Sequence, residues 1–120
     1  AGSMPHRITP NLLSQVAQHT ANATVITDRE GRTLWVNDAF ERLTGYTRAD
    51  MLGQFPGKIL QGPGTDPATR ARMHASLAAG TGFQVEILNY AKDGRAFWVA
   101  IDCQPFYDEE GNLHGFVAVQ

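Results

Sequence analysis

The last third of the chain alternates between apolar and polar residues. Three alternating runs, separated by polar turns, cover 83–90, 95–106 and 113–120. A period of two predicts half-buried β-strands, and Lys92-Asp93-Gly94 between the first two runs predicts a tight hairpin. A second pair of predicted strands surrounds the polar turn at 29–32 and covers 23–28 and 33–37. The sequence therefore predicts five strands.

Short helices are predicted between these two groups of strands. The expected capping residues are Asn37 or Asp38, Thr47 and Asp66, and the glycines expected to end the three helices are Gly45, Gly53 and Gly80. One helical turn is expected near 58–60, and an amphipathic helix over 9–19 begins with Thr9 and Pro10. The order of elements predicts an α+β fold with one antiparallel sheet and the short helices covering one face.

The composition is that of one globular domain, with 120 residues, 42% hydrophobic and 18% charged. Ten basic against twelve acidic residues lack the basic excess of a nucleic-acid-binding domain. No apolar run approaches the roughly 20 residues of a membrane span, so no membrane contact by this domain is expected. One cysteine and no leader sequence predict a cytoplasmic protein.

The motifs of common catalytic and metal sites are missing. No pair of the four histidines has the spacing of helical metal ligands, and one cysteine cannot form a zinc cluster. There is no phosphate-binding loop, nucleophile elbow or dinucleotide fingerprint. We therefore expect neither a dedicated metal site nor an enzyme.

Four motifs in order resemble the PAS domain family and, within it, the flavin-binding light-oxygen-voltage (LOV) branch. They are Thr24–Asp28 (TVITD), Leu60–Asp66 (LQGPGTD), Glu86–Tyr90 (EILNY) followed by Lys92-Asp93-Gly94 and Phe97-Trp98, and Gly115–Gln120 (GFVAVQ). The resemblance implies the PAS fold, a five-stranded antiparallel sheet with helices closing a ligand pocket over one face. It divides the chain into a tag remnant at 1–3, a helical flank at 4–21 and a PAS sensor domain at 22–120.

Two amides stand on predicted apolar faces. Strand alternation puts Asn89 on one face with Phe83, Val85 and Ile87, and Gln120 on one face with Phe116 and Ala118. A buried amide needs hydrogen-bond partners, and the pyrimidine edge of a flavin offers both donors and acceptors. The alternative is that these amides satisfy backbone groups. The resemblance implies that Asn89 contacts the pyrimidine edge, Gln120 the carbonyl and redox-active nitrogen, and Gln61 the ribityl chain.

The remaining residues that the resemblance places at the pocket are mostly apolar. They are Val25, Thr27, Ile87, Val99, Ile101, Cys103 and Phe116, with Lys58 and His74 toward the phosphate. Alternation puts Cys103 on one face with Phe97, Val99 and Ile101, where it is either a small packing residue or a thiol directed at the flavin.

Several positions depart from the LOV pattern. The run Phe55–Gln61 is one residue longer than its LOV counterpart, and Gly57 stands at the position of the adduct-forming cysteine. Lys58 and His74 replace the two phosphate-binding arginines, and Val99 replaces the second pyrimidine-binding asparagine. These departures argue against a flavin–cysteine adduct and favour FAD over FMN, as in FAD-containing PAS domains of bacterial redox sensors. Haem, suggested by His74, is the less favoured cofactor.

The expected function is a sensory domain that binds FAD noncovalently and signals its redox state. The expected partner is an effector joined to the C-terminus, of the histidine kinase, diguanylate cyclase or chemoreceptor type, in a homodimer formed through the N-terminal helix and a sheet face. One alternative is a ligand-free PAS interaction module that dimerises through Leu12, Leu13 and Val16. The other is a blue-light sensor in which a Trp or Tyr side chain, with Trp35 and Trp98 as candidates, donates an electron to the flavin.

Overall fold

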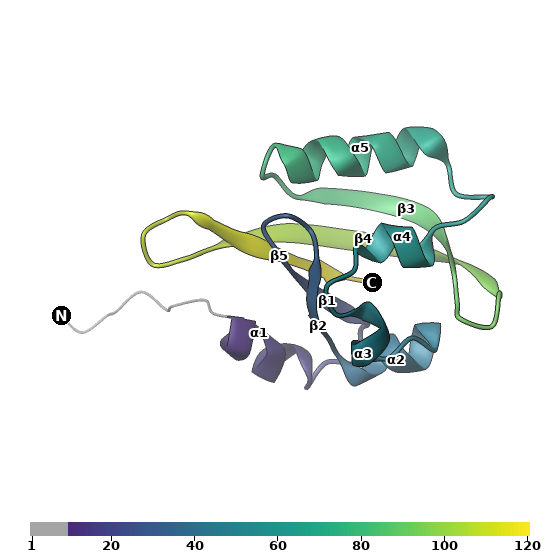
Figure 1. The fold of residues 1–120 in the computed structure, drawn as a ribbon, viewed down its shortest axis with the longest axis horizontal. Coiled ribbons are helices and arrows are strands. Elements are labelled where there is room, and N and C mark those ends of the chain that lie inside the picture. Colours follow the sequence, from purple (N-terminus) through teal and green to yellow (C-terminus); the bar gives the residue numbers. More distant parts are fainter. Residues whose placement is uncertain (1–9) are drawn as a thin grey trace.

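The computed structural model describes residues 10–120 and forms one five-stranded antiparallel sheet with helices packed against it (Figure 1). The elements in chain order are α1 (Pro10–Ala17), β1 (Thr24–Asp28), β2 (Thr33–Val36), α2 (Asp38–Thr44), α3 (Arg48–Met51), α4 (Pro56–Leu60), α5 (Pro67–Ala78), β3 (Phe83–Tyr90), β4 (Ala96–Tyr107) and β5 (Leu113–Val119). The α+β fold predicted from the sequence is confirmed. Thr9, the predicted tag remnant at 1–3 and the side chains of Leu12 and Leu13 lie outside the described part of the chain.

The strands lie in the order β2-β1-β5-β4-β3, so the first and last strands of the chain pair in the middle of the sheet. Val25 of β1 pairs with Ala118 of β5, Ala118 pairs with Cys103 of β4, and Cys103 pairs with Phe83 of β3. Paired residues point to the same face of a sheet. One continuous inner face therefore runs across four strands.

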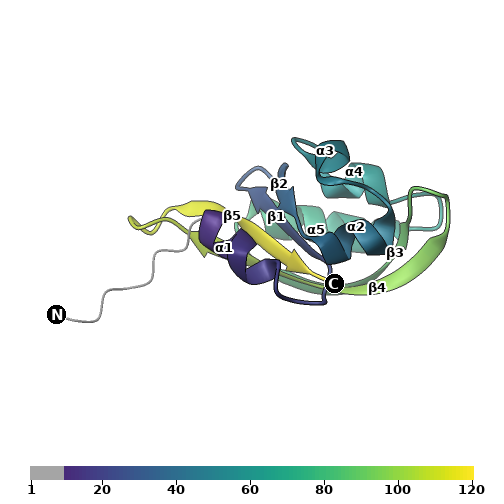
Figure 2. The same ribbon diagram turned by 90° about the horizontal axis from the view of Figure 1, so that it is seen from below.

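Helices α2, α3, α4 and α5 gather on one side of the sheet, which Figure 2 shows from a second direction. The choice between Asn37 and Asp38 as the cap of α2 is settled in favour of Asn37, whose side chain accepts from the N–H of Phe40. Thr47 caps α3 and Asp66 caps α5, both as predicted. Helix α1 packs against β1 and β2. Across residues 10–120, no helix is long and apolar enough to cross a membrane.

The apolar interior is divided into two clusters. The first contains Ala23, Val25, Val36, Phe40, Met51 and Leu60, and the second contains Val85, Ile87 and Ile101. Ala118 of the central strand β5 packs against both. A gap in side-chain packing between two clusters leaves room for a ligand, so the division of the core positions the candidate site.

Candidate functional site

A cavity of about 100 Å³ lies between the inner face of the sheet and the helices α4 and α5. Eight of the residues predicted for the pocket line it: Val25, Thr27, Gln61, Asn89, Ile101, Cys103, Phe116 and Gln120. They come from four strands and from the end of α4, and the sheet register brings them together.

The Gln120 side chain carries an unpaired polar atom. Its Oε1 is buried and accepts no hydrogen bond from residues 10–120. The backbone N–H of Gln120 donates to the carbonyl oxygen of Ala23 at 2.9 Å, which fixes the residue at the end of β5. Leaving a buried acceptor unpaired costs about 1–3 kcal/mol. The cavity is therefore suited to a ligand that carries a hydrogen-bond donor at this point.

A second amide, Asn89, lines the same cavity from β3. Its side chain is among the most buried polar groups of the protein, with 2% of the residue exposed. It sits on the inner face beyond Val85 and Ile87, as the alternation of β3 predicts. The cavity thus has amides on an edge strand and a central strand, with apolar residues between them.

A third amide belongs to Gln61, which ends α4. Its backbone N–H donates to the carbonyl oxygen of Gly57 at 3.0 Å, and its side chain folds back over that glycine. A Cβ atom added to Gly57 would stand 2.8 Å from Gln61 Nε2. The missing side chain at Gly57 therefore makes the space in which the Gln61 amide reaches the cavity wall.

Cys103 faces the cavity from β4 and is 3% exposed. Burial, and secondarily the negative charge of Asp102, raises the pKa of its thiol to about 12. The thiol therefore stays protonated at neutral pH, which makes it a poor nucleophile.

Four predicted pocket residues do not line the cavity. Ile87 lies in the second apolar cluster and Val99 packs against it, so both support the wall rather than form it. Lys58 and His74 are exposed, because α4 presents Leu60 and α5 presents Met73 to the interior instead. Neither residue lines the apolar cavity, and their contact with a flavin phosphate stays a prediction.

Several cavity residues were missed by sequence reasoning. They are Gly31, Pro56, Leu60, Met73 and Leu77. The spacing of Met73 and Leu77 by four residues is a helical signal that could have identified the inner side of α5. No local pattern marks Gly31 or Pro56, because the β1–β2 turn and α4 meet only in the folded chain.

Of the charged side chains in residues 10–120, none lines the cavity. Among the described residues no group of three or more His, Cys, Asp or Glu could hold a metal ion. Three amides among apolar walls suit a neutral, planar heterocycle whose edge both donates and accepts hydrogen bonds.

Comparison with known proteins agrees with this geometry. The family model described as PAS domain matches residues 21–120. The chain is 40% identical over 87 residues to a blue-light-activated histidine kinase of Brucella anthropi, and 36% identical over 118 residues to blue-light-activated histidine kinase 1 of Erythrobacter litoralis. These matches cover 72% and 95% of the chain but only 18% and 32% of the two kinases.

A solved Light-Oxygen-Voltage domain, studied with a flavin analogue, is similar throughout the fold. It has a TM-score of 0.82 and 32% sequence identity, and the match covers 91% of this chain and 82% of that one. The chain therefore belongs to the PAS domain family, as a sensory domain related to blue-light flavin sensors.

Proposed function

We propose that this chain binds a flavin noncovalently in the cavity and signals the redox state of that flavin to an effector joined to its C-terminus. The unpaired Gln120 Oε1 is the observation that carries the proposal, because a buried amide with an unpaired atom beside a cavity fits a ligand that bonds to it. The amide would accept through Oε1 from a reduced flavin and, after a half-turn, donate through Nε2 to an oxidised one. The domain itself performs no catalysis in this proposal.

The cavity residues match the parts of a flavin by their chemistry. Asn89 and Gln120 would bind the polar edge of the ring system, and Ile101 and Phe116 would contact its apolar faces. A cavity of about 100 Å³ is smaller than the roughly 300 Å³ at which pockets for drug-sized ligands begin. Binding therefore requires the α4 wall to move outward, starting with the side chain of Gln61.

Signalling in this proposal depends on the amide of Gln120. A bound flavin supplies reversible uptake of electrons and a proton at one ring nitrogen. The Gln120 amide can donate through Nε2 or accept through Oε1, so a half-turn of the amide follows a change of its partner from acceptor to donor. Because Gln120 directly follows β5, this rotation would act on the chain that leads to the effector.

FAD is the proposed flavin. Within the described part of the chain no basic side chain lines the cavity, and Lys58 and His74 are exposed, so a monophosphate finds no buried cationic clamp there. An FAD molecule can spread its contacts over the adenosine part instead. The exposed position of His74 on α5 also leaves haem without support, since none of the three histidines in residues 10–120 lines the cavity.

The proposal is tested by the visible absorption spectrum of the purified chain, followed by chromatography of the heat-released chromophore against FAD and FMN. A blue absorption band that survives gel filtration, with FAD released, is expected. A chain that stays colourless after incubation with FAD, FMN and haem contradicts the proposal, and leaves a PAS interaction module as the function.

A matched pair of variants tests whether the cavity amide of Gln120 carries the signal. Gln120→Leu removes the cavity amide, whereas Gln84→Leu makes the same change at an exposed position of β3. We expect Gln120→Leu to bind flavin but to lose the response of the linked effector to reduction, and Gln84→Leu to keep both. An unchanged response in Gln120→Leu contradicts the signalling role.

Blue light is the second candidate stimulus, because the two related kinases are described as activated by it. Gly57 carries no thiol, and Cys103 is held protonated on the opposite wall, so a light response would use electron transfer from an aromatic residue. Trp98 is 70% exposed on the outer face of the sheet, away from the cavity. Illumination of the oxidised protein in air separates the two stimuli, since redox sensing predicts no lasting spectral change.

The same relatives guide the proposed partners. By analogy with the two histidine kinases, we propose a kinase-type effector, a cytoplasmic location and a homodimer formed through α1 and the sheet. Val16 of α1 is 64% exposed and available for such a contact. Sedimentation of the chain with and without residues 4–21 tests the role of the flank.

A further inference from the structure

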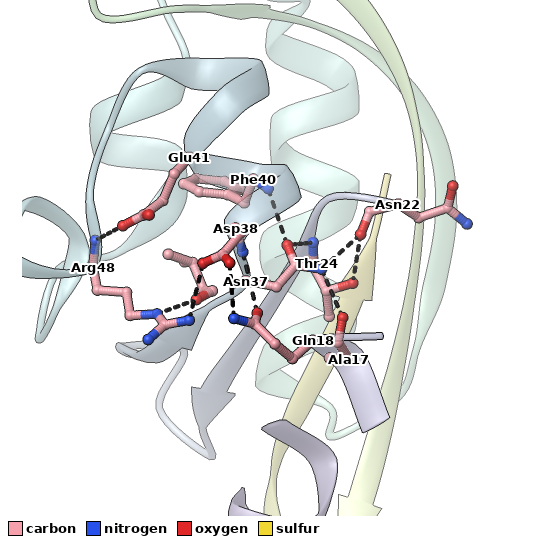
Figure 3. Close-up of polar contacts among 10 residues, drawn as sticks. Ala17, Gln18, Asn22, Thr24, Asn37, Asp38, Phe40, Glu41 and Arg48 are labelled. Atoms are coloured by element: carbon pink, nitrogen blue, oxygen red, sulfur yellow. Dashed lines mark hydrogen bonds and ion pairs between the residues drawn. The ribbon is translucent and has the colours of Figure 1, made fainter. Parts of the chain in front are cut away.

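One buried side chain outside the cavity holds three segments together (Figure 3). Asn37 is 1% exposed and lies where α1 ends and where β1 and α2 begin. Its Oδ1 accepts from the backbone N–H groups of Thr24 and Phe40, each at 2.9 Å. Its Nδ2 donates to the carbonyl oxygens of Ala17 and Asn22, at 2.9 and 2.8 Å. The amide therefore uses its full hydrogen-bonding capacity.

Asn37 caps two helices at once. The first N–H groups and the last carbonyls of an α-helix have no partner inside the helix. Asn37 offers an acceptor to the start of α2 and a donor to the end of α1. Helix α1 has 8 residues, fewer than the roughly 12–15 below which an isolated helix is marginal in water. Its helical state therefore depends on this contact and on packing against the sheet.

A second, exposed contact between Gln18 and Asp38 also connects the end of α1 to the start of α2. Gln18 Nε2 donates to Asp38 Oδ2 at 2.9 Å, and the backbone N–H of Asp38 donates to Gln18 Oε1 at 3.3 Å. Both groups are open to water, so they contribute less than the buried amide. Asn37 is therefore a buried polar attachment of α1.

The segment that Asn37 holds is also bonded to the cavity residue Gln120. The N–H of Gln120 donates to the carbonyl of Ala23, which lies between Asn22 and Thr24. Asn37 contacts the backbone of both of these neighbours. A displacement of Gln120 therefore reaches Asn37 through one intervening residue.

We propose that Asn37 couples occupancy of the cavity to the attachment of α1. The coupling rests on the proposed function, because the ligand acts through Gln120. When a ligand pairs with Gln120, the end of β5 and the carbonyl of Ala23 shift with it. The bonds from Nδ2 to Ala17 and Asn22 change together, while those to Oδ1 keep α2 capped. Helix α1 responds because it has only 8 residues and its last residue, Ala17, is bonded directly to Asn37.

Hydrogen exchange of backbone amides in residues 10–20 tests the role of Asn37. Asn37→Asp keeps both accepted bonds and remains a good helix cap, but removes both donated bonds. We expect exchange in α1 to accelerate about tenfold or more, and the first amides of α2 to stay protected. The control Asn22→Asp adds the same charge on a side chain that points away from the cluster in Figure 3 and leaves exchange unchanged. Equal exchange in the chain and in Asn37→Asp overturns the proposal.

Coupling to the cavity is measured in two arms. In the first, saturation with FAD changes the exchange of α1 severalfold in the unmodified chain but not in Asn37→Asp, and an equal change in both overturns the coupling. The second arm needs no ligand: Gln120→Leu changes the exchange of α1, and the matched variant Gln84→Leu does not. If FAD does not bind, the proposed function fails, while this second arm still decides whether Gln120 and α1 are coupled. If Asn37→Asp does not fold, the comparison of Gln120→Leu with Gln84→Leu still tests whether Gln120 and α1 are coupled.

Discussion

Filling the cavity from the sheet side should stabilise the ligand-free protein and prevent ligand binding. Ala118 is the residue to change, because it lies in the central strand β5 and packs against both apolar clusters. Ala118→Val adds the volume of two methylene groups on a residue type that favours strands. The resulting side chain would occupy space that the cavity now leaves open.

The magnitude follows from the cavity volume. At about 24 cal/mol per Å³ for a closed void, a cavity of about 100 Å³ destabilises the fold by at most about 2.4 kcal/mol. Two buried methylene groups recover at most about 1.6 kcal/mol of this. We expect the free energy of unfolding of the ligand-free chain to rise by about 1 kcal/mol, since the neighbouring side chains must adjust.

Urea denaturation measures the change as a shift of the midpoint at constant slope. Ala100→Val is the control, because Ala100 is exposed on the outer face of β4, and its effect should stay within about 0.5 kcal/mol. Flavin affinity should fall at least about tenfold in Ala118→Val and remain unchanged in the control. A variant that is less stable without ligand and still binds flavin refutes the assignment of this cavity as the binding site.

Three further predictions concern single groups. The thiol of Cys103 should resist thiol reagents at pH 8 until the chain is unfolded. Its pKa is raised to about 12 from an ordinary value near 9, so the free energy of unfolding should fall as pH rises through that interval. Hydrogen bonds from Thr69 lower the pKa of Asp66, so the stability of the α5 cap is fully present above the ordinary carboxyl pKa and is lost as pH falls through the lowered one. Protection of the first α5 amides, measured relative to their intrinsic exchange rates, should fall in acid, and should be low at every pH in Asp66→Ala. Gly57→Cys should displace the flexible end of Gln61 and place a thiol on the cavity wall; illumination of the flavin-loaded variant should then bleach the blue band reversibly, whereas Gly57→Ala should not.

Much of the fold follows from local sequence patterns. Alternation in 83–90 and 95–106 predicts β3 and β4 and the inward face of Asn89, because side-chain direction in a strand depends only on residue parity. The turn at Lys92-Asp93-Gly94 is equally local, with Gly94 at a φ of 90° that other residues rarely adopt. Caps at Thr47 and Asp66 are short-range hydrogen bonds that a sequence shows directly.

The sequence predicts less well which side of each short helix faces the cavity. The resemblance placed Lys58 and His74 toward a flavin phosphate; both are exposed, and the residues that their helices turn to the cavity, Leu60 and Met73, were not predicted. Helix α4 has 5 residues, too few for a periodic apolar pattern, and α5 has no fully buried residue. The direction in which such helices face is determined by the sheet against which they pack.

The sequence by itself determines the strands, the caps and which residues share a strand face, because these depend on neighbours a few positions apart. Tertiary structure alone decides the pairing of β1 with β5, which places Gln120 beside Ala23, and the gap between the two apolar clusters. It also decides that Asn37, a predicted cap of one helix, closes the end of another that lies twenty residues earlier in the chain. The cavity forms where distant segments leave space between their side chains, and the shared cap forms where distant segments come into contact. No local sequence pattern encodes either outcome.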